Sequence, residues 1–82
     1  MNEQEKQATR DRIGLRIASL RKLAGMTQEE LATKAGLQRT HVGRIEAGKY
    51  AVTLETIQAI AEALDMTVDI IDKKLAGLTR IG

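Results

Sequence analysis

The stretch "TQEELATKAGLQRTHVGRIEAGK", Thr27–Lys49, contains two short helical patterns separated by Gly36. At its start, Thr27 and Glu30 have the spacing of a capping box, in which each side chain accepts a hydrogen bond from the backbone N–H of the other residue. The apolar side of the helix that follows is formed by Leu31, Ala32 and Ala35. We expect this helix to end at Gly36, because glycine readily adopts the left-handed conformation that closes many helices.

The second pattern begins after Leu37 and should end near Gly48, its C-terminal cap. Val42 and Ile45 fall on one side of this helix, as expected for a short amphipathic helix. The other side is crowded with hydrogen-bonding side chains, those of Gln38, Arg39, Thr40, His41 and Arg44. Gly43 lies in the middle, where glycine costs about 1 kcal/mol relative to alanine. A helix that accepts this cost is expected to press its polar side against another molecule.

Two short helices that meet at a glycine can cross steeply only if the residue at their contact point is small. Ala32, four residues before Gly36, meets this requirement. A small core should close beneath the crossing, built from Leu31, Ala35, Leu37, Val42 and Ile45. This is the helix-turn-helix arrangement, in which the second helix lies in the major groove of DNA.

The rest of the chain also has helical periodicity. In "RIGLRIASLRKLAG", the apolar residues at steps of four and three are Ile13, Ile17, Leu20 and Ala24, with Gly25 as the cap. After the N-cap Thr53, the stripe of a further helix consists of Leu54, Ile57, Ile60, Ala61 and Leu64. A fifth helix is expected at residues 68–76, after Thr67. The pattern predicts an all-α, compact five-helix bundle: one domain, 1–82, with its core at about 10–75 and a flexible N-terminal arm and C-terminal tail.

Composition supports a single small helical domain. The 82 residues are 43% apolar, with one aromatic residue, Tyr50, and no proline or cysteine. The lack of cysteine excludes disulfides and thiolate metal sites and is typical of cytoplasmic proteins. No apolar run has the length of a signal peptide or membrane span. Residues 1–50 hold ten basic and six acidic residues, and residues 51–82 hold three and five. This asymmetry suggests a face for a polyanion, although chance would also explain it.

Catalysis and metal binding have little support in the sequence. One serine, one histidine and no cysteine cannot assemble a nucleophilic triad. Asp69 and Asp72 are one turn apart, but solvated charge explains them better than a catalytic pair. His41 has no second ligand at metal-binding spacing, and no glycine-rich phosphate loop is present. We therefore expect no enzyme activity, no metal and no cofactor.

Three stretches carry a family resemblance: "RIASLRKLAGMTQEELATKAG", "RTHVGRIEAGK" and "TLETIQAIAEALDM". In this order they resemble the Cro and lambda-repressor-like family, also called the XRE family, over about residues 12–72. The resemblance implies a five-helix bundle that binds operator DNA, usually as a dimer. It also implies that the second and third helices form the DNA-contacting unit.

The resemblance further implies which residues contact DNA. Base contacts are expected from Gln38, Arg39, Thr40 and Arg44, of which Arg44 could instead hold a phosphate. Phosphate contacts are expected from Gln28, which can also brace a base-contacting side chain, and from Lys49. Gln38 departs from the family's usual Ser or Thr cap, and the loop "YAVT" lacks the family's frequent proline. The residue pattern itself suggests that His41 contacts a phosphate from the flank of the helix, or is simply exposed.

Arg39 and Gly43 each have two explanations, and Glu46 has one that comes from the resemblance. The Arg39 guanidinium could pair with O6 and N7 of guanine, or Arg39 could be an ordinary solvated charge. Gly43 could let the helix sit deeply in the groove, or it could relieve crowding against the first helix. Glu46 is misplaced for a residue near DNA, and the resemblance implies a partly buried ion pair with Arg21.

These patterns predict a sequence-specific regulator of transcription that binds double-stranded DNA. Repression by occlusion, as a homodimer on a palindromic operator, is the expected mechanism, and restriction–modification controller proteins are the nearest likeness. The dimer should form through the last helix, by Val68, Ile70, Ile71, Leu75 and Leu78, with recognition helices about 34 Å apart; otherwise these residues pack inward. The alternatives are an antitoxin that also binds a toxin, and a protein-interaction module that does not bind DNA.

Overall fold

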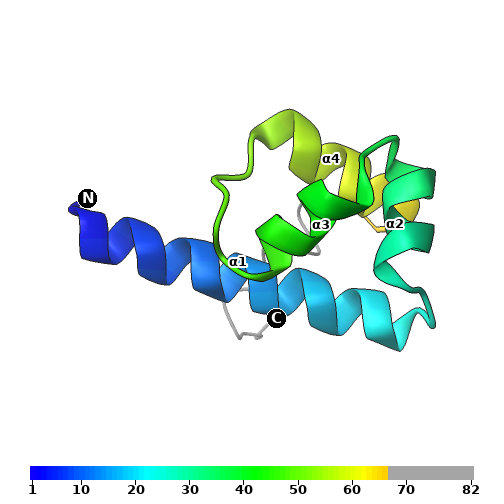
Figure 1. Ribbon diagram of the computed structural model, residues 1–82, viewed down its shortest axis with the longest axis horizontal. Coiled ribbons are helices and arrows are strands. Elements are labelled where there is room, and N and C mark those ends of the chain that lie inside the picture. The colour runs from blue at the N-terminus through cyan, green and yellow to red at the C-terminus, as the bar shows by residue number, and fades with distance from the viewer. Residues whose placement is uncertain (67–82) are drawn as a thin grey trace.

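The computed structural model describes residues 1–66, which form four α-helices (Figure 1). They are α1 (Glu3–Leu23), α2 (Gln28–Ala35), α3 (Arg39–Glu46) and α4 (Leu54–Ala63). No strand occurs in this range, which agrees with the predicted all-helical class. The expected helix at 68–76 lies outside the described residues, so the count of five helices is not confirmed. In the described part of the chain, no helix is long and apolar enough to span a bilayer.

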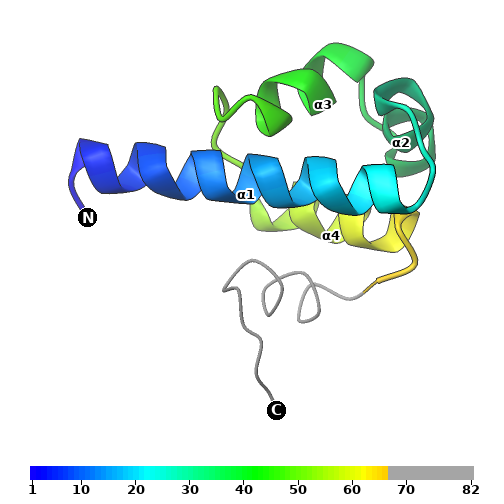
Figure 2. The same cartoon turned by 90° about the horizontal axis from the view of Figure 1, so that it is seen from below.

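The longest helix, α1, begins at Glu3, ten residues before the apolar stripe that starts at Ile13. A capping box opens it: the Asn2 side chain accepts from the Glu5 N–H, and the Glu5 carboxylate accepts from the Asn2 N–H, each at 2.8 Å. The segment expected as an N-terminal arm is therefore helical. Because its side chains are mostly exposed, it has no apolar stripe, and only this cap marks the helix start. Its first turns extend beyond the other helices (Figure 2).

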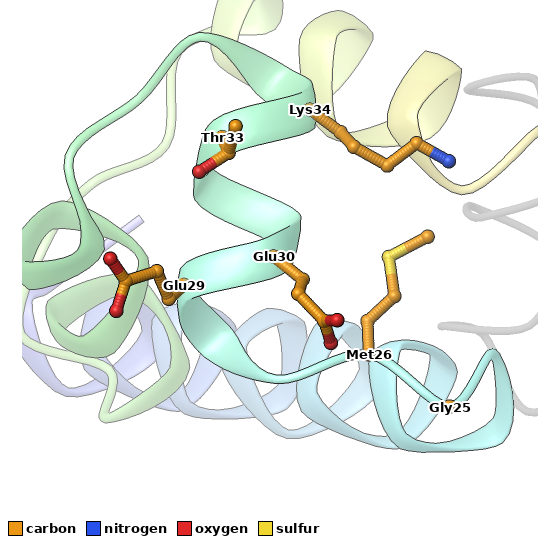
Figure 3. Close-up of a pocket in the computed structure, with 6 residues that line it drawn as sticks. All are labelled: Gly25, Met26, Glu29, Glu30, Thr33 and Lys34. Atoms are coloured by element: carbon orange, nitrogen blue, oxygen red, sulfur yellow. The ribbon is translucent and has the colours of Figure 1, made fainter.

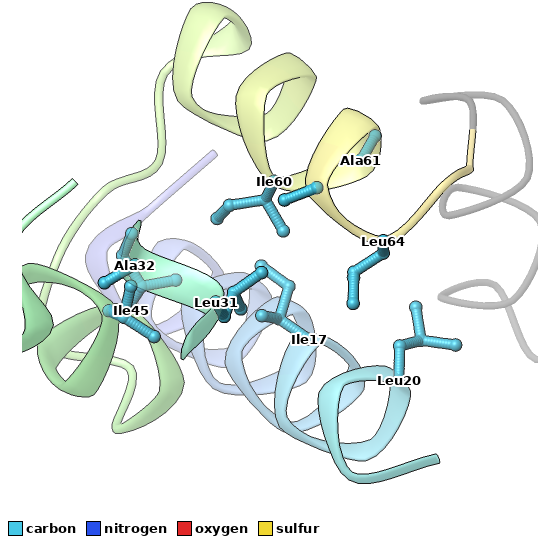
Figure 4. Packing of buried hydrophobic residues seen from close by; sticks show 10 residues of the cluster. Ile17, Leu20, Leu31, Ala32, Ile45, Ile60, Ala61 and Leu64 are labelled. Carbon is cyan, nitrogen blue, oxygen red and sulfur yellow. The ribbon is translucent and has the colours of Figure 1, made fainter. Parts of the chain in front are cut away.

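The helices α3 and α4 lie on opposite faces of the bundle, with α2 at the end where α1 finishes (Figures 1 and 2). Residues from all four helices form one core between these faces (Figure 4). The core consists of Ile17, Leu20, Leu31, Ala32, Val42, Ile45, Ile60, Ala61, Ala63 and Leu64. Ile13, Ala35 and Leu37 are partly buried at its edge. The predicted helix-turn-helix core is confirmed, since Leu31, Ala32, Val42 and Ile45 are buried together.

Two residues assigned to apolar stripes are exposed, so their predicted burial is wrong. Ala24 is the C-cap of α1, where the chain turns away from the helix axis. Leu54 is 71% exposed. It is the first residue of α4, a turn before Ile57, which is partly buried. Helical periodicity predicts the face of a helix on which a residue lies. It does not predict which part of that face is covered by another helix.

The predicted helix ends are confirmed. At the end of α3, the Gly48 N–H donates to the Ile45 carbonyl at 3.1 Å and the Lys49 N–H to the Arg44 carbonyl at 2.9 Å. This pair of bonds requires a left-handed residue, and Gly48 has φ of +74°. Gly25 and Gly36 take the same conformation after α1 and α2. Asp65 takes it after α4, with φ of +57°.

Another glycine, Gly14 in α1, allows the backbones of α1 and α3 to come into direct contact. A Cβ at this position would lie 2.7 Å from the Glu46 carbonyl oxygen and closer still to that of Ile45. Such contacts involve backbone atoms, which cannot move aside as the end of a side chain can. Gly14 is therefore required for the α1–α3 contact.

We expect Gly14→Ala to destabilise the fold by about 1–3 kcal/mol, the usual cost of overpacking. Gly43→Ala is the matched control, because a Cβ there meets only the Gln28 amide, at 3.7 and 3.9 Å. Alanine should gain up to about 1 kcal/mol at position 43 from helix propensity. Urea or thermal unfolding measures both changes. A Gly14→Ala variant as stable as the parent would contradict the close α1–α3 contact.

Candidate nucleic-acid interface

The helix α3 presents one polar side to solvent. Val42 and Ile45 are buried beneath it, while Arg39, Thr40 and Arg44 are exposed. Gln38, also exposed, is the N-cap residue with extended backbone, and its side chain makes no capping hydrogen bond. Its amide is therefore not used to cap the helix.

A chain of side chains connects the core to the exposed start of α3. Arg21 donates from Nε to Glu46 Oε2 at 2.7 Å and from Nη2 to Glu46 Oε1 at 3.0 Å. Gln28 Nε2 donates to Glu46 Oε1 at 2.9 Å, and Arg39 Nη1 donates to Gln28 Oε1 at 3.0 Å. We call Arg21, Glu46, Gln28 and Arg39 the polar chain. It places the guanidinium of Arg39 on the flank of α3 that faces α2.

The ion pair at the base of the polar chain has the geometry that the family resemblance implies. The side chains of Arg21 and Glu46 are 10% and 6% exposed, and Arg21 Nη1 also donates to the Met26 carbonyl at 2.8 Å. The hydrogen bonds to Glu46, and then its charge, raise the pKa of Arg21, while burial opposes this. A raised folded-state pKa stabilises the fold at every pH below the range where arginine titrates. Arg21 therefore keeps its charge wherever the protein is folded.

Gly43 lies under the Gln28 amide. The atoms within 4 Å of a Cβ at position 43 belong to Gln28. Crowding against the first helix is thus the wrong explanation for Gly43. A Cβ at this position would be in ordinary contact with the Gln28 amide, at 3.7 and 3.9 Å.

His41 and Tyr50 meet on the other flank of α3. Their ring centroids are 4.6 Å apart with planes at 58°, and His41 Nε2 is buried without a hydrogen-bond partner in residues 1–66. A hollow of about 170 Å³ opens beside this pair, lined by Gln38, Thr40, His41, Arg44 and Tyr50. The structure therefore places predicted DNA-contacting residues on both flanks of α3. The sequence pattern does not indicate Tyr50, because a lone aromatic in a loop has no periodicity.

The loop after α3 lacks the proline that is frequent in the family, so the sequence does not determine its path. In the structure, this loop is held by α1. Gln7 Nε2 donates to the Gly48 carbonyl at 2.8 Å, and Gly48 packs against Asp11. Lys49, the next residue, is exposed beside this anchor. The extension of α1 thus positions a residue predicted to contact phosphate.

A larger hollow, of about 380 Å³, lies on the outer side of α2 (Figure 3). It is lined by Gly25, Met26, Glu29, Glu30, Thr33 and Lys34. Its carboxylates would repel a phosphate backbone, so this side of α2 is unsuited to nucleic acid. Within residues 1–66, no group of three His, Cys, Asp or Glu side chains could hold a metal ion.

Comparison with known proteins identifies a family and several relatives that resemble this chain. A family model described as Helix-turn-helix matches residues 17–71. The immunity repressor protein of Bacillus phage phi105 is 41% identical over 59 residues, which cover 72% of this chain and 41% of that protein. The control protein C.SmaI of Serratia marcescens is 38% identical over 52 residues, covering 63% of this chain and 62% of that protein. The chain thus spans less than two thirds of the length of both relatives.

A solved structure with the same arrangement is that of the restriction-modification controller protein C.AhdI from Aeromonas hydrophila. It superimposes with a TM-score of 0.76 at 38% sequence identity, covering 78% of this chain and 97% of that chain.

We expect Glu46→Ala to destabilise the protein by roughly 3–5 kcal/mol, because it leaves the buried Arg21 charge unpaired. Glu62→Ala, an exposed glutamate in α4, is the matched control and should change stability by less than about 0.5 kcal/mol. Chemical unfolding at neutral pH measures both. If Glu46→Ala unfolds like the parent, the ion pair does not support the fold.

Proposed function

This chain belongs to the helix-turn-helix family, and we propose that it is a regulator of transcription that binds a specific site in double-stranded DNA through α3. The relatives named above support this role, since one is called an immunity repressor and the other a control protein. The observation that carries the proposal is Arg39, a guanidinium held at the exposed start of α3 by side chains anchored in the core.

Arg39 is suited to a guanine contact because its position is set before DNA arrives. Among the described residues, Gln28 engages only Nη1 of Arg39, so other N–H groups of the guanidinium can pair with O6 and N7 of guanine. Holding the side chain in advance reduces the entropy lost on binding. Gln28 thus acts as the brace, and its location at the start of α2 also suits a phosphate contact.

The remaining contacts divide by position on α3. Gln38, Thr40 and Arg44 are exposed along the polar side and are proposed to contact bases, with Arg44 near enough to the flank to hold a phosphate instead. Gly43, which carries no side chain between α3 and the Gln28 amide, is proposed to let α3 sit close to the base edges. Lys49, in the anchored loop, is proposed to contact a phosphate.

Repression by occlusion, as a homodimer on a palindromic operator, is the mechanism we propose. The predicted dimer-forming residues lie outside the described residues: Val68, Ile70, Ile71, Leu75 and Leu78. A two-fold axis would place two α3 helices about 34 Å apart on one side of the duplex.

Sedimentation at high micromolar concentration, with and without DNA, tests the dimer, since a two-fold interface should give twice the monomer mass. Leu75→Glu should shift the protein toward monomer by placing a charge in an apolar contact. Glu55→Lys, an exposed charge reversal in α4, serves as the control. A parent protein that stays monomeric in both conditions would contradict the dimer.

Arg39→Ala and Lys49→Ala should weaken binding in different ways. Arg39→Ala should cost roughly 1–3 kcal/mol on the best site and far less on random DNA, because it removes a base contact. Lys49→Ala should weaken binding to both DNAs and reduce the salt dependence of the binding constant by about one unit per protomer. Sites are first selected from random DNA, and titrations on a selected and a scrambled duplex at several salt concentrations separate the effects.

Lys34→Ala is the control for these titrations, because it removes the same charge from the outer side of α2. It should leave both affinities nearly unchanged. If Arg39→Ala weakens binding to both DNAs equally, Arg39 contacts only a phosphate. Failure to select any site from random DNA would overturn the proposed function.

A further inference from the structure

The single histidine and the single aromatic residue of this chain are in contact with each other, next to the polar side of α3. We propose that the hollow beside them binds one phosphate of the DNA backbone, with Tyr50 and Arg44 as its ligands and His41 as the positioning residue that holds Tyr50. This inference rests on the proposed function and adds Tyr50 to the DNA-binding surface.

The lining of the hollow is suited to a phosphate. Arg44 contributes a guanidinium, and Thr40 and Tyr50 contribute hydroxyl groups. Charged and hydroxyl donors of this kind are the usual partners of phosphate oxygens. Arg44 takes no part in the polar chain, whose hydrogen bonds join Arg21, Glu46, Gln28 and Arg39. Within residues 1–66 no carboxylate lines this hollow, in contrast to the hollow on the outer side of α2.

One ring nitrogen of His41, Nε2, is withdrawn from any phosphate contact, while the ring packs on Tyr50. This nitrogen is covered and has no hydrogen-bond partner in residues 1–66, so it cannot donate to a phosphate while the ring stays in place. The ring packs on Tyr50 at 4.6 Å, a separation at which aromatic rings attract each other. Tyr50 remains 45% exposed, so it is accessible from outside.

A phosphate at this hollow would complete the support of α3 on both flanks. Gln28 lies on the flank toward α2, and Tyr50 lies on the flank toward the loop after α3. A helix in the major groove has a phosphate backbone on either side. Contacts to both backbones set the depth and register of the helix without contributing to base preference.

Tyr50 provides its own spectroscopic probe, because the chain has no tryptophan and no other tyrosine. We expect its emission to change when full-length protein is saturated with a selected duplex, after correction for absorption by DNA. A scrambled duplex should produce the same change at higher concentration, since a phosphate contact does not depend on sequence. Emission that is identical in free and saturated protein would overturn the proposal.

Variants at position 50 and at Arg44 test the two ligands. Tyr50→Phe keeps the ring but removes the hydroxyl, and should weaken binding to both duplexes by about tenfold with an unchanged salt slope. Arg44→Gln should weaken binding and lower the salt slope by about one unit per protomer. Equal affinity of Tyr50→Phe and parent on both duplexes would overturn the role of Tyr50. In that case, tight binding of the parent to its selected site would leave the proposed function intact.

The role of His41 is tested by rescue. His41→Ala removes the ring contact and should lower affinity about as much as Tyr50→Phe, whereas His41→Phe should restore most of that loss by packing on Tyr50 again. The emission change on DNA binding should be lost and restored in parallel. If His41→Phe binds as weakly as His41→Ala, a ring nitrogen contributes directly and the positioning role is wrong.

Discussion

The buried ion pair between Arg21 and Glu46 joins the last turn of α1 to the last residue of α3. Two charges with so little access to water are stable only if their hydrogen-bonding capacity is used. Arg21 also donates to the Met26 carbonyl, and Glu46 also accepts from Gln28, so the pair meets this condition. A helix as short as α3 does not hold itself together in water. Its position therefore depends on this pair and on the core beneath it.

The pair acts together with unusually close backbone contacts. Gly14 lets α1 touch the carbonyl end of α3, and Gly48 packs against Asp11 while its carbonyl accepts from Gln7. A core without Phe or Trp has few large side chains with which to lock helices in place. Small residues at the crossings compensate, because they allow backbones to approach until dispersion contacts are made directly. The result is a short helix whose outer side is held rigidly toward solvent.

This construction connects fold stability to recognition. The polar chain begins in a buried charge and ends at Arg39, so the same carboxylate that neutralises Arg21 also orients the brace for the proposed base contact. The opposite flank of α3 uses an aromatic contact and a loop anchored on α1. Under our proposals, base contact is supported from the core, whereas backbone contact is supported by the loop.

The sequence by itself determined the helix-turn-helix, because caps and apolar periodicity act over a few neighbouring residues. The structure shows the predicted capping box of Thr27 and Glu30, and it shows the left-handed conformation of Gly36 and Gly48 at the helix ends. The resemblance to helix-turn-helix regulators and restriction–modification controllers is confirmed by the family match and the relatives. The partnership of Arg21 with Glu46 followed only from that resemblance, since no local pattern joins residues so far apart.

Tertiary structure alone decided the contacts between distant segments. It placed Gln28 over Gly43, brought His41 to Tyr50, and buried His41 Nε2. It also left Leu54 exposed despite its place in an apolar stripe. Each outcome depends on where two helices cross and how closely their backbones approach. Local periodicity carries the direction of a side chain, but the identity of its neighbour is determined only when the whole bundle packs.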